Sequence, residues 1–374
     1  MKSNRFFKQP GFSLIELMVA MALGTFLLAG VIQIFISNKQ SYRLQEGQSR
    51  VQENARYVLE LLGRDVREAG YTGCRGLNKI TTVKVGNPPL PSFDLNSAVI
   101  GRWWDQSSSS WSVTIPATVT NVVAGTDVLT IQRGDSCGAT ITDNAASATM
   151  KVAWPNSCGL KAGDATLVTD CSTAHMFKVT TAPEPSPSSL KQTVTHGSNN
   201  NTATHLCTEY TNPYPADNNG LSSCVAGAKI YTSPPAQLLK FASYTYFIAL
   251  GTNGLPSLFR LDNSSVVDYP NNPVELVEGV ENMQITYGIG VSGIASSYAA
   301  DTKFPTPPTA PAGATPNDWA DVISARIDLL FESIDENITI GDQSFIYNGA
   351  TVTSSDGRIR RVFSTTITIR NRML

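Results

Sequence analysis

The stretch Gly11-Phe-Ser-Leu-Ile-Glu-Leu-Met-Val-Ala20 opens an apolar run that continues to Ile36. Between residues 12 and 36 the run contains no proline and a single charged side chain, that of Glu16. The run is about 25 residues long, which is enough for a helix to cross a hydrocarbon core of ~30 Å. We therefore predict one membrane-spanning helix over residues 12–36.

The residues before this run carry only positive charge, from Lys2, Arg5 and Lys8. Basic residues next to a membrane helix keep that side of the chain in the cytoplasm. No Ala-x-Ala cleavage site follows the run, which disfavours an ordinary secretory signal peptide. We therefore expect a single-pass protein with a cytoplasmic N-terminus and a head domain on the other side of the membrane.

Two local features mark the start of the predicted helix. Pro10 and Gly11 disfavour helical backbone, so the peptide bond between Gly11 and Phe12 is expected to be accessible to a protease at the membrane face. Ser13 and Glu16 have the spacing of a capping box. Because a carboxylate inside a membrane is costly, a second and compatible explanation is pairing of Glu16 with a cationic amine that cleavage creates on Phe12, in the same chain or in a neighbour.

Helical periodicity continues beyond the apolar run to Glu68. Apolar residues recur there at spacings of three and four, while charged residues occupy the opposite face. We predict one continuous helix from about Ser13 to Glu68, ended by Gly70. Its second half is expected to lie on the head through Val51, Ala55, Val58, Leu59, Leu62 and Val66.

The rest of the chain has the composition of an exported, loop-rich β domain, with 16% charged residues and a formal net charge of -2. This balance argues against a nucleic-acid partner. Short apolar runs between turn residues predict strands at 111–115, 128–132, 166–169, 176–180, 229–231, 243–249, 257–261, 275–288, 318–331 and 362–370. Residues 182–205 are expected to form a long exposed loop, and residues 302–317 a surface excursion.

Six cysteines fit an exported protein with up to three disulfides. Their pairing cannot be deduced from spacing, although Cys207 and Cys224 bracket a polar stretch and could form a local bridge. The candidate disulfide cysteines are Cys74, Cys137, Cys158, Cys171, Cys207 and Cys224.

No motif for catalysis or for a cofactor stands out. The sequence lacks Gly-rich phosphate loops, a Gly-x-Ser-x-Gly elbow and the close cysteine spacing of a zinc site. His175, His196 and His205 are interpreted as surface or hydrogen-bonded core residues. We therefore expect no enzyme activity, no cofactor and no metal.

Two sets of charged residues need a separate interpretation. Four aspartates in turn-like contexts lack the spacing of an EF-hand and are interpreted as turn residues. Three arginines near the C-terminus are expected to line a solvated sheet edge that discourages aggregation. The aspartates are Asp262, Asp268, Asp342 and Asp356, and the arginines are Arg358, Arg360 and Arg361.

The basic leader followed by Gly11-Phe-Ser-Leu-Ile-Glu16 resembles the class III signal of type IV prepilins and pseudopilins. The resemblance implies cleavage between Gly11 and Phe12 by prepilin peptidase, N-methylation of Phe12, and subunit docking through Glu16. It also implies an α+β, pilin-like fold, in which a long N-terminal helix packs on a large antiparallel β-rich head. The expected parts are a leader (1–11), a membrane or filament-core helix (12–36), an amphipathic helix (37–70) and the head (71–374).

Segments 69–74, 163–171, 276–288, 319–330 and 360–372 are similar to the PilW family of minor pilins. The resemblance implies a low-copy subunit that is stored in the bacterial inner membrane with a periplasmic head and then reaches the pilus. There it would act at or near the tip with other minor pilins, the major pilin and a large tip adhesin, priming assembly and supporting motility and adhesion. The alternatives are a J-type minor pseudopilin of type II secretion and a membrane-anchored periplasmic binding module.

Overall fold

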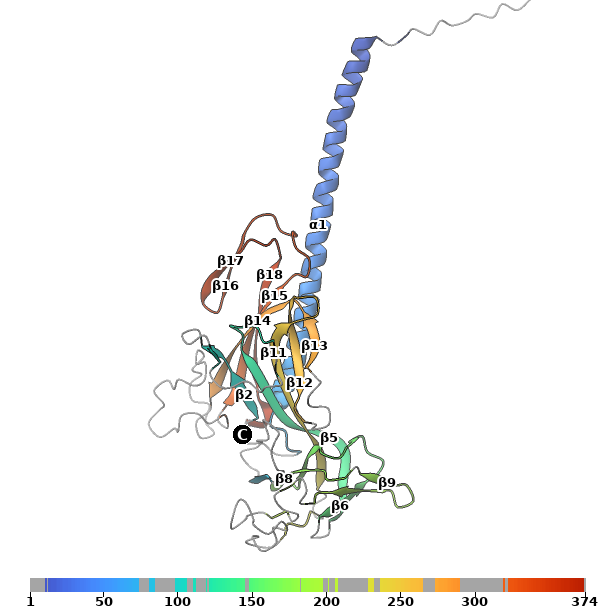
Figure 1. Ribbon diagram of the computed structural model, residues 1–374, viewed down its shortest axis with the longest axis vertical. Coiled ribbons are helices and arrows are strands. Elements are labelled where there is room, and N and C mark those ends of the chain that lie inside the picture. Colours follow the sequence, from blue (N-terminus) through green and yellow to red (C-terminus); the bar gives the residue numbers. More distant parts are fainter. Residues whose placement is uncertain are drawn as a thin grey trace, which may run out of the picture.

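A computed structural model describes residues 11, 13–73, 81–84, 98–105, 110–111, 119, 121–144, 148–181, 183–197, 201, 206–207, 228–231, 236–264, 273–289, 319 and 322–372. A single long helix, α1 (Leu14–Glu68), projects from a head built of strands that pair mainly antiparallel (Figure 1). The described strands form an 11-stranded sheet, a three-stranded sheet and two ribbons of two strands. The predicted α+β, pilin-like fold is confirmed.

The strands are β1 (Thr81–Lys84), β2 (Val99–Arg102), β3 (Trp104–Asp105), β4 (Ser110–Trp111), β5 (Val128–Asn144), β6 (Thr149–Ala153), β7 (Ala165–Thr169), β8 (Thr173–Lys178), β9 (Glu184–Ser186), β10 (Lys191–Thr195), β11 (Gln237–Leu250), β12 (Pro256–Asp262), β13 (Pro273–Glu278), β14 (Val280–Ile289), β15 (Val322–Glu332), β16 (Gln343–Tyr347), β17 (Ala350–Ser354) and β18 (Arg360–Thr368). A short 3-10 helix, η4 (Arg370–Arg372), follows the last strand.

Both predicted ends of the helix are confirmed. At its start, Ser13 is extended and its backbone N–H donates to the Glu16 carboxylate at 3.0 Å, as in a capping box. At its end, Gly70 adopts a φ of 71°, a conformation that glycine tolerates better than other residues and that stops the helix.

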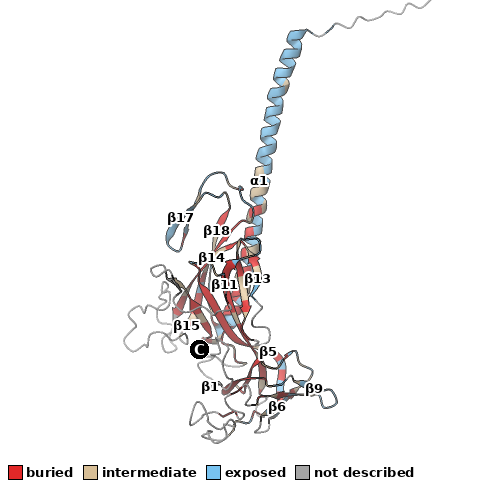
Figure 2. Ribbon diagram, in the orientation of Figure 1, coloured by how far each residue is buried: buried red, intermediate tan, exposed pale blue. Residues whose placement is uncertain are grey.

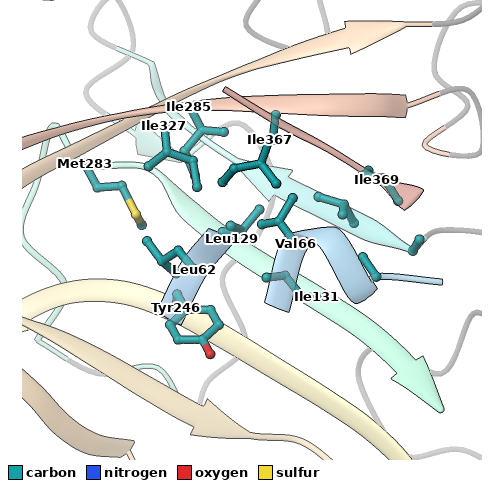
Figure 3. Close-up of a cluster of buried hydrophobic side chains, with 14 of the residues drawn as sticks. Leu62, Val66, Leu129, Ile131, Tyr246, Met283, Ile285, Ile327, Ile367 and Ile369 are labelled. Carbon is teal, nitrogen blue, oxygen red and sulfur yellow. The ribbon is translucent and has the colours of Figure 1, made fainter. Parts of the chain in front are cut away.

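The second half of α1 forms part of the main core. Its predicted apolar stripe is buried against both sheets, except for Leu59, which is partly buried. Figure 3 shows Leu62 and Val66 among side chains from the large sheet and from the sheet formed by β14, β15 and β18. The labelled partners are Leu129, Ile131, Tyr246, Met283, Ile285, Ile327, Ile367 and Ile369.

Two long strands, β5 and β11, connect this core to a second one at the end of the head far from the free half of α1 (Figure 1). The first residues of β11 pair with β7 on one side, whereas its later residues pair with β12 on that side. The strand therefore passes from one part of the head to the other. The second core lies around β6, β7, β8 and β10 and contains the Cys137–Cys158 disulfide.

The structure splits one predicted strand. Residues 275–288 form β13 and β14, separated by Gly279, which has a φ of 78°. A Cβ at this position would lie 2.6 Å from the backbone oxygen of Glu332, so glycine permits the close approach of β15.

Other strand predictions are confirmed or corrected. The runs 128–132, 166–169, 243–249, 257–261 and most of 362–370 lie in strands. The predicted loop 182–205 is wrong in part, because β9 and β10 pair there and β10 also pairs with β6, burying Val194. Residues 229–231 are not a strand; only the adjacent Ala228 makes a bridge, to Cys207. Residues 112–115 and the excursion 302–317 lie outside the described part of the chain.

Candidate functional site

The first half of α1 presents apolar side chains to solvent on every side (Figure 2). Leu14 and Phe26 are each 79% exposed, and none of the most apolar window of the helix is buried. A soluble monomer rarely exposes so large an apolar surface. By length and composition this helix is able to cross a membrane.

The predicted processing and docking residues lie at the tip of this exposed helix. Gly11 is exposed, and apart from its chain neighbours no atom of the described residues lies within 4 Å of the position that a Cβ would take. Phe12 lies outside the described residues. The Glu16 carboxylate is placed one turn into the helix, where it is ordered by the N–H of Ser13. Cleavage, methylation and docking at these residues stay predictions.

The last turn of α1 is fixed to the head by a buried ionic cluster. Asp65 is 1% exposed, and it accepts hydrogen bonds from Arg133 of β5, at 2.9 Å, and from the Tyr246 hydroxyl of β11. Arg133 also pairs with Glu68 at 3.1 Å and with Asp135 at 2.6 Å. Burial raises the pKa of Tyr246, and the Asp65 carboxylate raises it further, so the hydroxyl keeps its proton and remains a donor.

Sequence reasoning missed Asp65. The signal was present, because Asp65 lies three residues after Leu62 and seven after Val58, on the predicted apolar stripe. An acid at such a position needs a buried partner, and Arg133 supplies it.

A second contact holds the middle of α1. Residues 333–342, which connect β15 to β16 and which we call the strap, lie across the helix. Gln40 donates to the backbone oxygen of Ile338, and Arg43 donates to that of Glu336 at 3.2 Å. Ile338 is buried against Gly47, where a Cβ would come within 2.9 Å of its Cδ1 atom.

The predicted solvated arginine edge is wrong for two of its three residues. Arg360 is 9% exposed and pairs with Glu281 at 2.6 Å, Glu332 at 3.1 Å and Asp356 at 2.7 Å. Arg358 donates to two backbone oxygens of the strap and pairs with Glu336 at 2.9 Å. Only Arg361 is exposed, as expected. The arginines hold the strap, because β14, β15 and the strap bring acceptors to them.

The cysteines form disulfides wherever they are described. Cys137 of β5 is bonded to Cys158, with 4.7 Å between their Cα atoms. Cys171 and Cys207 are disulfide-bonded as well. Cys74 and Cys224 lie outside the described residues, and so does the expected bridge from Cys207 to Cys224.

The histidines were expected to be surface residues or hydrogen-bonded core residues, and two of them, His175 and His196, are buried. His196, expected in a loop, packs on Phe177 in the second core. His175 contacts the carbonyl of Cys207 through Nε2, at 2.7 Å, and the Tyr231 hydroxyl through Nδ1. Since a carbonyl only accepts, Nε2 carries the proton and Nδ1 accepts from Tyr231. His205 lies outside the described residues.

Burial lowers the pKa of His175 to about 4, against 6.5 when solvated. The unfolded chain therefore binds a proton that the native chain does not, and the free energy of unfolding should fall as pH drops from 6.5 towards 4. The loss attributable to this group is at most about 3.5 kcal/mol. Urea unfolding of the wild-type protein and of His175→Gln across this range checks the expectation. An equal pH dependence in both proteins would contradict it.

The described part of the chain contains no group of three or more His, Cys, Asp or Glu that could hold a metal ion. Asp262 accepts the backbone N–H of Ser264 at 2.8 Å, and Asp356 accepts that of Arg358 at 3.0 Å, as turn residues do. Asp342 is exposed, and Asp268 lies outside the described residues.

Comparison with known families gives two matches. Residues 7–32 match the model described as prokaryotic N-terminal methylation motif, and residues 245–371 match that described as type IV pilus-assembly protein W. No curated protein and no solved structure matches the chain. The two matches together, with the motif set at the start of an exposed apolar helix, support a type IV pilus-related pilin.

The second match supports a PilW-type minor pilin. It runs from β11 to η4 and thus includes the three-stranded sheet under α1, the strap and the arginines that hold it.

Proposed function

We propose that this chain is a minor pilin of a type IV pilus. It is stored in the inner membrane with its head in the periplasm, and it enters the pilus at or near the tip. With other minor pilins it primes assembly and supports motility and adhesion. The observation that carries the proposal is the fully exposed apolar half of α1 with one acid, Glu16, near its tip.

The energetics of this helix fit assembly from a membrane. Lipid tails are as apolar as neighbouring helices, so moving from bilayer to filament gains little hydrophobic free energy. Specificity must come from packing and from polar pairs. If Glu16 pairs with the amine of Phe12 in a neighbour, the two helices are offset by four residues, or ~6 Å along the axis.

The partners follow from the same proposal. Prepilin peptidase would cut before Phe12 and methylate it, and the mature subunit would contact other minor pilins, the major pilin and a tip adhesin. The role is structural rather than enzymatic. The match over residues 245–371 favours the pilus over a J-type pseudopilin of type II secretion. Co-purification with secretion components instead of pilus components would reverse that preference.

The Gly11→Ala variant should be processed very slowly or not at all. Among the described residues nothing lies within 4 Å of the added methyl group apart from neighbours in the chain, so the requirement for glycine would come from the peptidase. An immunoblot that separates precursor from mature protein measures the effect. Gly24→Ala is the matched control, because its surroundings are equally open and it lies inside the helix.

Normal mature protein in Gly11→Ala would count against the proposal. Mass spectrometry of the wild-type N-terminus provides the positive test, with methylated Phe12 as the expected first residue. A mature chain that begins at Met1 would instead favour the membrane-anchored binding module.

A further inference from the structure

The strap is the part of the head that meets α1 closest to its apolar half. In Figure 1 the chain between β15, β16, β17 and β18 arches above the sheets and reaches α1 on the side of the free helix. Its first contact with the helix is at Gln40, four residues after Ile36.

The thickness of a bilayer indicates the depth at which this contact lies in the membrane. Because a carboxylate is costly inside the hydrocarbon core, we place Glu16 at the far boundary of the core within the predicted span 12–36. From Leu17 to Ile36 the helix is then roughly 30 Å long, which equals the thickness of the core. Ile36 then lies at the boundary of the core on the side of the head. Gln40 follows about 6 Å further on, within the headgroup layer. The strap, hydrogen-bonded to Gln40, lies at the same depth.

The strap exposes an apolar side chain that the fold does not cover. Ile340 is 91% exposed, more than any other large apolar residue described. Two residues earlier, Ile338 is buried on α1, and Arg358 fixes the start of the strap through two backbone oxygens. The segment that precedes Ile340 is thus held in place while Ile340 is left uncovered.

The helix surface at this level has the composition of a membrane interface. Tyr42 is 67% exposed, and Lys39 is exposed as well. Tyrosine is enriched at the headgroup level, and lysine can reach lipid phosphates while its stem stays in apolar surroundings. The strap lies against Gln40, Arg43 and Gly47. Tyr42 and Lys39 lie at the same depth along the helix, on the part of its surface that the strap leaves uncovered.

We propose that the strap, together with Tyr42 and Lys39, is a membrane-interface contact. Its partner is the phospholipid surface of the leaflet that faces the head, with Ile340 inserted at the boundary between headgroups and acyl chains. The contact restrains the tilt of the head on the stored protein. This inference rests on the membrane-anchored state in the proposed function and is independent of incorporation into a filament.

The test uses the full chain reconstituted in vesicles of phosphatidylethanolamine and phosphatidylglycerol. Ile340→Cys is labelled with the fluorophore NBD under non-reducing conditions, and unlabelled wild type gives the background. Lipids brominated in their acyl chains serve as the quencher. The matched control is Ile346→Cys, which is 72% exposed but lies in β16 beside Tyr347, whose hydroxyl is bonded to Asn282 and to the backbone of Asp328 in the sheet.

The label at residue 340 should be quenched roughly twofold or more above the label at 346, and its emission should shift to the blue, because an interfacial side chain lies close to the acyl boundary. Equal quenching at both positions would overturn the inference. A blue shift at residue 340 that appears only after other pilins are added, without quenching by the brominated lipids, would also overturn the inference. That result would assign the surface to a contact with a neighbouring helix. Failure of every variant to sediment with vesicles would instead refute the anchored state itself, and the inference with it.

Discussion

Replacing Glu16 with alanine should leave the membrane-stored protein at its normal level and lower its recovery in sheared filaments by about tenfold or more. Alanine is easier to insert into a bilayer than a carboxylate, so storage is not impaired. In the filament, however, a neighbour's amine would lose its partner in surroundings of low dielectric. Leaving one charge of a buried pair unpaired costs about 3–5 kcal/mol.

Glu16→Gln separates the two roles of this residue. The glutamine oxygen can still accept the N–H of Ser13, which preserves the cap of α1. It carries no charge and cannot form an ion pair. Immunoblots of membrane and filament fractions should therefore show that Glu16→Gln, like Glu16→Ala, is stored normally in the membrane but poorly recovered in filaments. If the Gln variant enters filaments as well as the wild type, the acid acts only as a helix cap.

The Asp65→Ala variant should lose about 3–5 kcal/mol of unfolding free energy, since it leaves a buried arginine and a buried tyrosine hydroxyl without their shared acceptor. Arg133 would retain Glu68 and Asp135, but both of these are more exposed than Asp65. Guanidinium unfolding of the full chain in detergent micelles, followed by near-UV circular dichroism, measures the loss.

Glu46→Ala is the control for Asp65→Ala. The pair of Glu46 with Arg50 has a similar distance, 2.8 Å, and lies on the same helix, but both side chains are exposed to solvent. Its removal should change stability by about 0.5 kcal/mol or less. Equal effects of the two variants would show that burial does not govern the contribution of the Asp65 cluster.

Local patterns were enough to predict α1. Its span, cap and apolar stripe depend on residues a few positions apart, and the structure places Val51, Ala55, Val58, Leu62 and Val66 in the core. The same reasoning located most strands whose apolar residues alternate. It missed β10, because Val194 stands alone among polar residues and is buried only through pairing with β6.

The ionic clusters could not be predicted in the same way. Arg360 looks like a surface residue until Glu281 and Glu332, from two other strands, converge on it. Arg133 meets Asp65 across 68 residues of sequence. The residues Gly11, Phe12 and Glu16 were identified through a motif, whereas the two polar attachments of α1, to the strap and to Arg133, emerge only from the three-dimensional arrangement.

These two attachments have a mechanical consequence. The strap holds α1 near Gln40 and the Asp65 cluster holds it about 37 Å further along, so polar attachments lie at both ends of the stripe that packs in the core. A pulling force along α1 is shared between these attachments. The Asp65 cluster transmits its share to β5 through Arg133 and to β11 through Tyr246. Those long strands run through both cores of the head, so the load reaches both cores instead of a single joint.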